Sequence, residues 1–258
     1  MRRRDLVLAV PLLPLAAQAQ MVDLNDAINK AGRQRMLSQR MAKSYLAGGL
    51  GVERAQAERT LSASIAMFER QLVELSAFAP KPEIKATYQQ LDAAWGDYKA
   101  VLVGEQPARA RAASVLALSG KVLKLANDGT GQLEKVSQKP AGRLVNLCGR
   151  QRMLSQRMAA YYLSACWDVQ PQLCSAELAK AREEFIAAHE VLKRAPETTA
   201  AIQEQLAMAA LQWTFFDNAL RTLQPGGSDK QAMANVFTTS ERILQLMDGV
   251  TNLYSKLG

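Results

Sequence analysis

The chain has 258 residues, 48% of them hydrophobic and 22% charged, which is the composition of a folded globular protein and excludes a disordered chain. Its formal net charge of +8 is spread along the sequence rather than gathered in a tail. No nucleic-acid-binding motif accompanies that charge, so we expect no nucleic-acid partner. Good helix formers dominate, and no stretch alternates Val, Ile, Thr and aromatic residues, so we predict an all-α fold.

The first residues have the three parts of a secretory signal peptide. Arg2, Arg3 and Arg4 form a basic start, residues 6–15 are apolar, and Ala17-Gln18-Ala19 is a small-x-small cleavage site. The apolar stretch is shorter than the roughly 20 residues of a membrane-spanning helix, which disfavours a membrane anchor. We predict a signal peptide over residues 1–19, export to the periplasm by the general or the twin-arginine route, and no transmembrane segment in the mature chain.

The two halves of the sequence repeat one another. Gly32 to Ala42 reads GRQRMLSQRMA, and the same letters return 117 positions later, from Gly149 to Ala159. Asn29 and Asn146 match at the same offset, whereas the last helical stretch of each half aligns with a small shift. Self-similarity of this kind is typical of a duplicated architecture. We therefore predict two units, residues 20–138 and 139–258.

Each unit divides into four helical stretches at breaks rich in glycine and proline. The predicted helices cover residues 24–48, 53–79, 83–103 and 107–137 in the first unit, and 142–166, 173–194, 197–223 and 229–257 in the second. Short connections between helices favour antiparallel neighbours. The sequence therefore predicts two tandem antiparallel four-helix bundles related by internal duplication.

Arginines interrupt the apolar stripe of the repeated helix. At 100° per residue, Arg35 falls in the middle of that stripe with Gln39 beside it, and the second copy repeats this with Arg152 and Gln156. Because of this position we include Gln39 and Gln156 among the predicted ligand-binding residues. The other motif arginines lie together on a different side of each helix: Arg33 and Arg40 in the first copy, Arg150 and Arg157 in the second.

A buried arginine needs an anionic partner, because burying an unpaired charge costs several kcal/mol, by order of magnitude. Two interpretations stay open. In one, Arg35 and Arg152 each pair with a carboxylate on a neighbouring helix of their own bundle. In the other, the two copies pack about a pseudo-two-fold axis, and both arginines converge on one bound anion, for which guanidinium offers a planar fork of donors.

Both repeats resemble a known family. The run INKAGRQRMLSQRMAKSYL (residues 28–46) and the run VNLCGRQRMLSQRMAAYYL (residues 145–163) resemble the PilJ-type domain, the periplasmic amino-terminal region of type IV pilus chemotaxis transducers. They are also similar to the P-box of nitrate/nitrite sensor kinases. The resemblance implies a periplasmic four-helix sensor in which an arginine from each of two facing helices holds nitrate. By motif position it implies a ligand-binding set of Arg35 and Arg152 with Gly32, Gly149 and Lys30, although the second copy has Leu147 where the first has Lys30.

The cysteines leave two alternatives open. Cys166 and Cys174 bracket a short polar stretch, so in an oxidising compartment they either close a loop through a disulfide or remain free thiols. Cys148 falls inside a helical pattern, where we expect a small buried residue.

Catalytic and metal chemistry have little support. The single histidine, His189, lies on a helix rich in Glu and Lys, where we expect it to be solvated, and one histidine cannot build a di-iron bundle. We interpret Met36, Met41, Met153 and Met158 as core residues rather than a copper site. We therefore expect no enzymatic activity, no metal and no cofactor.

We expect an exported, soluble sensor-type protein that binds a small anion between the two motif helices, with nitrate or nitrite as the leading ligand. Because the sequence contains no membrane helix or output domain, sensing would operate through a partner such as a membrane-bound receptor, in a chemotaxis-related signalling role. The alternative is a structural or interaction module of the cell envelope whose motif arginines form internal ion pairs.

Overall fold

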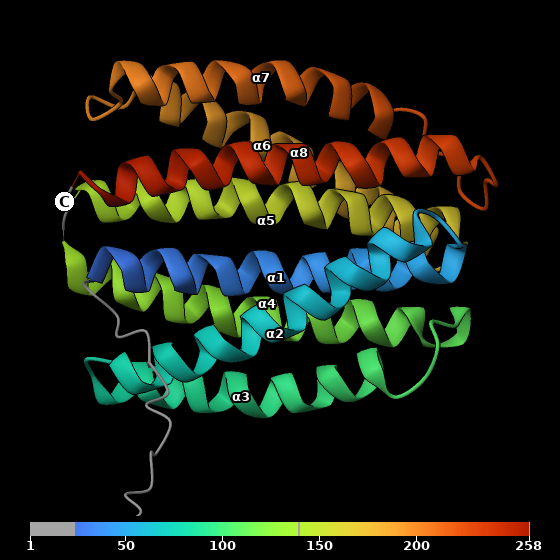
Figure 1. Cartoon of the computed structure of the whole chain (residues 1–258), viewed down its shortest axis with the longest axis horizontal. Helices are drawn as coiled ribbons and strands as arrows, with labels where there is room; N and C mark the ends of the chain where they lie inside the picture. Colours follow the sequence, from blue (N-terminus) through green and yellow to red (C-terminus); the bar gives the residue numbers. More distant parts are fainter. Residues whose placement is uncertain (1–23, 139, 258) are drawn as a thin grey trace, which may run out of the picture.

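The computed structural model describes residues 24–138 and 140–257, and within these ranges it contains eight α-helices and no strand (Figure 1). The predicted signal peptide, with its cleavage site near Ala19, lies outside the described residues. In chain order the helices are α1 (Leu24–Leu50), α2 (Arg54–Phe78), α3 (Pro82–Val103), α4 (Arg109–Ser137), α5 (Pro140–Cys166), α6 (Pro171–Arg194), α7 (Ala200–Leu220) and α8 (Lys230–Ser255). None of the helices in this part of the chain is long and apolar enough to span a bilayer.

The helix ends follow local rules. Pro82 and Pro171 begin α3 and α6, where a missing backbone N–H costs nothing, and this is why both helices begin slightly earlier than predicted. Thr199 and Asp229 cap α7 and α8 by accepting hydrogen bonds from the backbone N–H groups of the first turn. The first helix, predicted to end at residue 48, continues to Leu50 before Gly51 takes a positive φ of 67°.

The helices form two groups, α1–α4 and α5–α8, which confirms the predicted all-α tandem bundles. Within each group the first helix packs against the second and the fourth, and the third packs mainly on the fourth. The first helices of the two groups, α1 and α5, also pack against each other along the middle of the molecule (Figure 1). The predicted unit boundary at residues 138 and 139 stays a prediction.

The two central helices run parallel. Near their beginnings Gly142 lies against Ile28, and near their ends Gly49 lies against the indole ring of Trp167. Parallel helices that carry the same motif at the same level are related by a pseudo-two-fold axis that runs along them. The duplicated chain therefore contains, within one polypeptide, the kind of self-complementary contact that two-fold dimers use.

The duplication extends to individual hydrogen bonds. The Gln34 side chain donates to the backbone carbonyl of Phe68 at 3.1 Å, and Gln151 donates to that of Phe185 at 2.7 Å. Each of these phenylalanines packs against a tryptophan of the next helix, Trp95 or Trp213, with ring centroids 4.5 and 4.3 Å apart. Repeated side-chain contacts of this kind fix each second helix to its motif helix in the same register.

The three cysteines are free thiols in the structure. Cys166 and Cys174 are not bonded, and the Cys174 thiol instead donates to the backbone carbonyl of Val169 at 3.5 Å. The Cys166 thiol faces the Tyr162 hydroxyl and the backbone of Gln224. Burial raises the pKa of both thiols, so both favour the protonated form. Cys148 is fully buried, as predicted.

The prediction that His189 is solvated was wrong. The imidazole is buried and stacks on Phe185 one helical turn earlier, with ring centroids 6.3 Å apart. Both residues lie on the face of α6 that packs into the second group, whereas the Glu and Lys residues of this helix occupy its other faces. All four motif methionines are buried, as predicted, and in the described ranges no group of three His, Cys, Asp or Glu side chains could hold a metal ion.

The contact between Gly49 and Trp167 leads to the first prediction. A methyl group at Gly49 would overlap the Trp167 ring, so we expect Gly49→Ala to lower the free energy of unfolding by about 1–3 kcal/mol. Gly48→Ala is the matched control, because a methyl group there meets only Pro107, at 3.6 Å. Urea unfolding of both variants tests this, and equal stability of the two variants would contradict the packing of α1 against the end of α5.

The buried histidine predicts a pH dependence. Burial lowers the pKa of His189, and the nearby Lys193 adds to this while Glu190 opposes it. Because the unfolded chain then binds the proton more readily, this histidine costs stability as the pH falls below about 6.5. We expect the wild type to lose more melting temperature than His189→Gln between pH 8 and pH 5. Parallel losses in both proteins would show that His189 does not contribute.

Candidate functional site

The two central helices approach most closely at the motif glycines. A methyl group on Gly149 would lie 3.4 Å from the Cα of Gly32 and 3.0 Å from Nη2 of Arg35. A methyl group on Gly32 would lie 3.3 Å from Nη2 of Arg35 and 3.5 Å from Nη2 of Arg152. The structure therefore brings together four of the predicted site residues, with both guanidinium groups against the crossing of α1 and α5.

Each arginine binds the helix of the other copy. Nη2 of Arg35 donates to the side-chain oxygen of Asn146 at 2.7 Å and to its backbone carbonyl at 3.0 Å. Nη2 of Arg152 donates to the side-chain oxygen of Asn29 at 2.9 Å and to its backbone carbonyl at 3.3 Å. The two arginines are almost completely buried. We call Arg35 and Arg152 the arginine pair.

The remaining contact differs between the two halves of the pair. Nη1 of Arg152 forms an ion pair with Asp248 on α8, whereas Nη1 of Arg35 donates to the side-chain oxygen of Asn127 on α4, at 3.1 Å. Asp248 on α8 and Asn127 on α4 occupy equivalent positions. Asp248 follows Ser240 by the same number of residues as Asn127 follows Ser119, and the backbone carbonyls of these two serines accept from the motif glutamines Gln156 and Gln39. Arg152 therefore forms an ion pair with a carboxylate of its own group, as one of the two interpretations expected, whereas Arg35 does not.

The electrostatic surroundings of the two arginines differ accordingly. Burial and the positive charges of Arg150 and Arg152 lower the pKa of Arg35 to about 9. The carboxylate of Glu134 opposes this, but it reaches Arg35 only through the amide of Asn146, which donates to it. Burial also lowers the pKa of Arg152, and there Asp248 opposes the shift directly.

Asp248 is held ionised by its neighbours. Burial favours its protonated form, but Arg152 and Arg33 outweigh this effect and lower the pKa of the carboxyl group. In each arginine the Nε–H has no hydrogen-bond partner among the described residues, although it is buried. A buried donor without a partner costs about 1–3 kcal/mol, so the arginine pair retains unused capacity for an acceptor.

Three other predicted site residues lie away from the arginine pair. Lys30 forms ion pairs with Asp26 at 2.9 Å and with Glu74 at 2.8 Å. Gln39 donates to the backbone carbonyl of Ser119 at 3.2 Å, and Gln156 donates to that of Ser240 at 3.0 Å. These glutamines join each motif helix to the last helix of its own group.

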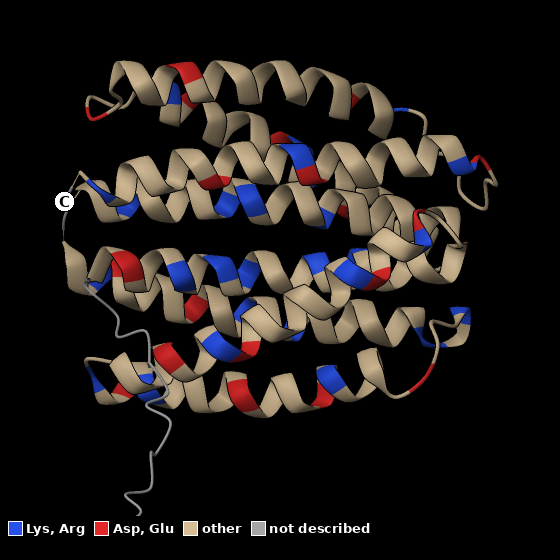
Figure 2. Ribbon diagram, in the orientation of Figure 1, with Lys and Arg blue, Asp and Glu red and all other residues tan. Residues whose placement is uncertain are grey.

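The outer motif arginines pair differently in the two copies. Arg33 and Arg40 of α1 reach across to α8, where they contact Asp248 at 3.4 Å and Glu241. Their counterparts on α5 turn to α6 of their own group: Arg150 pairs with Glu184, and Arg157 pairs with Glu177 at 2.8 Å. Figure 2 shows the basic residues that recur along α1 and α5 in the middle of the molecule.

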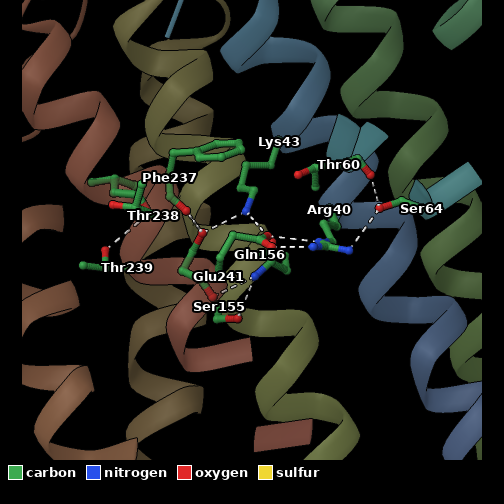
Figure 3. Close-up of polar contacts among 12 residues, drawn as sticks. Arg40, Lys43, Thr60, Ser64, Ser155, Gln156, Phe237, Thr238, Thr239 and Glu241 are labelled. Atoms are coloured by element: carbon green, nitrogen blue, oxygen red, sulfur yellow. Dashed lines mark hydrogen bonds and ion pairs between the residues drawn. The ribbon is translucent and has the colours of Figure 1, made fainter. Parts of the chain in front are cut away.

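A buried lysine completes the contact between α1 and α8 (Figure 3). Nζ of Lys43 lies 2.5 Å from the Glu241 carboxylate, 3.0 Å from the Ser240 hydroxyl and 4.3 Å from the centre of the Phe237 ring. Burial lowers the pKa of Lys43 to about 8 in spite of Glu241. Lys43 and Arg40 outweigh the burial of Glu241 and hold its pKa at about 2. The second copy has Ala160 at the position of Lys43, so this cluster exists only once.

A groove of about 700 Å³ lies beside this contact, between α1, α2 and α8. Its charged lining consists of Arg33, Arg40, Glu241, Arg242 and Asp248. The side chain of Asp248 is 38% exposed, whereas that of Arg152 is 0% exposed. Asp248 is therefore the point at which this groove meets the buried arginine pair.

Several residues of the site were not predicted. Asn29 and Asn146 match in the repeat, and that match was the available signal for a shared role. Asn127, Asp248 and Lys43 differ from their counterparts in the other copy, so the repeat could not identify them.

Comparison with known proteins identifies the same duplication. The family model for the N-terminal domain of type IV pili methyl-accepting chemotaxis transducers, PilJ, matches residues 17–118 and again residues 136–237. The methyl-accepting chemotaxis protein McpN of Pseudomonas aeruginosa is 40% identical over 85 residues, which are 30% of this chain and 15% of that protein. The chain thus spans only a small part of this relative, and no solved structure matches it significantly. The chain belongs to the PilJ family and contains two tandem copies of its domain.

Proposed function

We propose that the chain is an exported, non-catalytic sensor module that binds one small oxyanion at the arginine pair. The observation that carries this proposal is the pair itself. Two guanidinium groups from the two copies lie buried at one helix crossing, each with an unpartnered Nε–H, and Arg35 contacts only neutral oxygens directly. A planar oxyanion matches the donor geometry of guanidinium and would offset the charge of Arg35.

Nitrate and nitrite are the leading ligands, because the motif resembles the P-box of nitrate/nitrite sensor kinases. Membership of the PilJ family supports a signalling role. We place the module in the periplasm and infer that it signals through a membrane-bound receptor, in a chemotaxis-related response. The chemotaxis role of the McpN relative supports that response. Since the pair joins α1 to α5, a bound anion would act on the contact between the two copies.

The ion pair between Arg152 and Asp248 favours a second candidate function. In this alternative the chain is a structural or interaction module of the cell envelope, and the motif arginines serve as internal ion pairs. Such a module would need no small ligand.

Ligand-dependent stability tests the first proposal. The melting temperature of the mature protein is measured with nitrate, nitrite, chloride and sulfate at equal ionic strength. A ligand at 100 times its dissociation constant adds about 2.7 kcal/mol of stability, so we expect nitrate or nitrite to raise the melting temperature by several degrees. Arg35→Ala should abolish the rise, whereas Arg157→Ala, which changes a more exposed motif arginine that pairs with Glu177, should retain it. No ion-specific rise in the wild type would refute anion binding.

The unequal partners of the two arginines give a separate prediction about stability without ligand. Arg152→Met leaves the partly buried Asp248 carboxylate with Arg33 alone, whereas Arg35→Met leaves only neutral amides behind. We expect Arg152→Met to lower the free energy of unfolding by about 1–3 kcal/mol more than Arg35→Met does. Urea unfolding in chloride-free buffer measures the difference. Equal losses would contradict the unequal pairing of the two arginines.

A further inference from the structure

The two halves of the arginine pair are built on the same plan, but the partner of Nη1 differs in charge. Both arginines bind an asparagine of the opposite motif helix, and both have an unpartnered Nε–H. The equivalent helices α4 and α8 then differ, because α4 places the amide of Asn127 against Arg35 and α8 places the carboxylate of Asp248 against Arg152. The chain therefore contains a natural comparison between a half with a neutral partner at Nη1 and a half with a charged one.

The Asp248 carboxylate has the chemistry of the ligand class itself. It is a planar group with two oxygens and one negative charge, and it contacts a guanidinium donor. It also contacts Arg33 and lines the groove, so it stands between solvent and the buried Arg152. An anion that enters from the groove meets this carboxylate before it reaches Arg152, and like charges repel it there.

We propose that Asp248 is a built-in oxyanion that occupies the Arg152 half of the pair, so that the site takes one monovalent anion, at Arg35, and excludes divalent ones. This inference rests on the proposed function and adds the charge class of the ligand and the residue that determines it. The two guanidinium groups carry two positive charges, and Asp248 offsets one of them. A dianion would leave an excess negative charge buried at the crossing, which is costly.

Glu134 does not play the same part for Arg35. Its carboxylate accepts from the amide of Asn146 rather than from the guanidinium, and the corresponding amide of Asn29 donates to the neutral Asn252 at 3.3 Å. Glu134 thus stabilises Arg35 at a distance while leaving its Nε–H without a partner. Asn127 and Asp248, which contact the guanidinium groups directly, therefore determine how much negative charge a ligand can bring to each arginine.

Exchanging these two residues tests the proposal. Titration calorimetry of the mature protein with sodium nitrate and with sodium sulfate compares the wild type, Asp248→Asn, Asn127→Asp and the double exchange. We expect the wild type to bind nitrate but not sulfate. Asp248→Asn should bind nitrate about tenfold more tightly or more and should gain sulfate binding, because a charged competitor is gone. Asn127→Asp should weaken nitrate binding by about tenfold or more, because both halves are then occupied.

The double exchange is the matched control. It retains one amide and one carboxylate but swaps their halves, so we expect it to recover the nitrate binding that Asn127→Asp loses. Asn127→Asp adds an ion pair to Arg35 and should raise the melting temperature without nitrate. That variant alone therefore decides the question if Asp248→Asn fails to fold. Nitrate affinity unchanged by Asn127→Asp would overturn the proposal.

The outcomes separate this inference from the function on which it rests. In one outcome, the wild type binds nitrate while neither single exchange changes the nitrate affinity or allows sulfate to bind. That result would support the proposed function and overturn the role of Asp248. If neither the wild type nor Asp248→Asn binds nitrate or sulfate, both are overturned.

Discussion

The close approach of Gly32 and Gly149 is the constraint on which the site depends. Because neither residue has a Cβ atom, α1 and α5 can pack closely enough for each arginine to reach an asparagine on the other helix. A larger side chain at either position would meet the guanidinium groups and the opposite backbone. The identical motifs thus encode a helix crossing as much as a set of charges, and the arginine pair exists only because the crossing brings the two copies together.

Duplication within one chain allows the two halves to differ, which identical subunits of a two-fold dimer cannot do. The two motif helices are identical from Gly32 to Ala42 and from Gly149 to Ala159, whereas the helices that cover them differ at the positions facing the motif. Helix α8 carries Glu241 and Asp248, and at the equivalent positions α4 carries Gly120 and Asn127. Arg33 and Arg40 therefore bind across the copies to α8, and their counterparts on α5 bind α6 instead. The asymmetry of the site follows from its covering helices.

Much of the fold was predictable because it depends on local patterns. Helical periodicity and glycine or proline breaks gave the helices, and the wheel placed Arg35 and Arg152 on the buried face, where both lie. The partners were not predictable from one helix. Lysine is rarely buried, so nothing local indicates that Lys43 is covered by Phe237 and paired with Glu241 about 200 positions away. His189 was misjudged because charged neighbours in sequence lie on other faces of α6. The spacing of Cys166 and Cys174 in the sequence does not show whether their thiols point toward each other, which a disulfide requires.

The difference between α4 and α8 also affects how ligand binding could change the arrangement of the two copies. A ligand changes the relation between two parts of a protein only if it binds one arrangement better than another. Contacts between α1 and α8 resist such a change, because the buried Lys43 and the partly buried Arg40 and Glu241 form an ionic cluster across the copies. The equivalent contact between α5 and α4 has Ala160 and Gly120 in place of the lysine and the glutamate. A rearrangement at the arginine pair therefore meets less resistance on the side of α4, which is also the helix that carries Asn127 against Arg35.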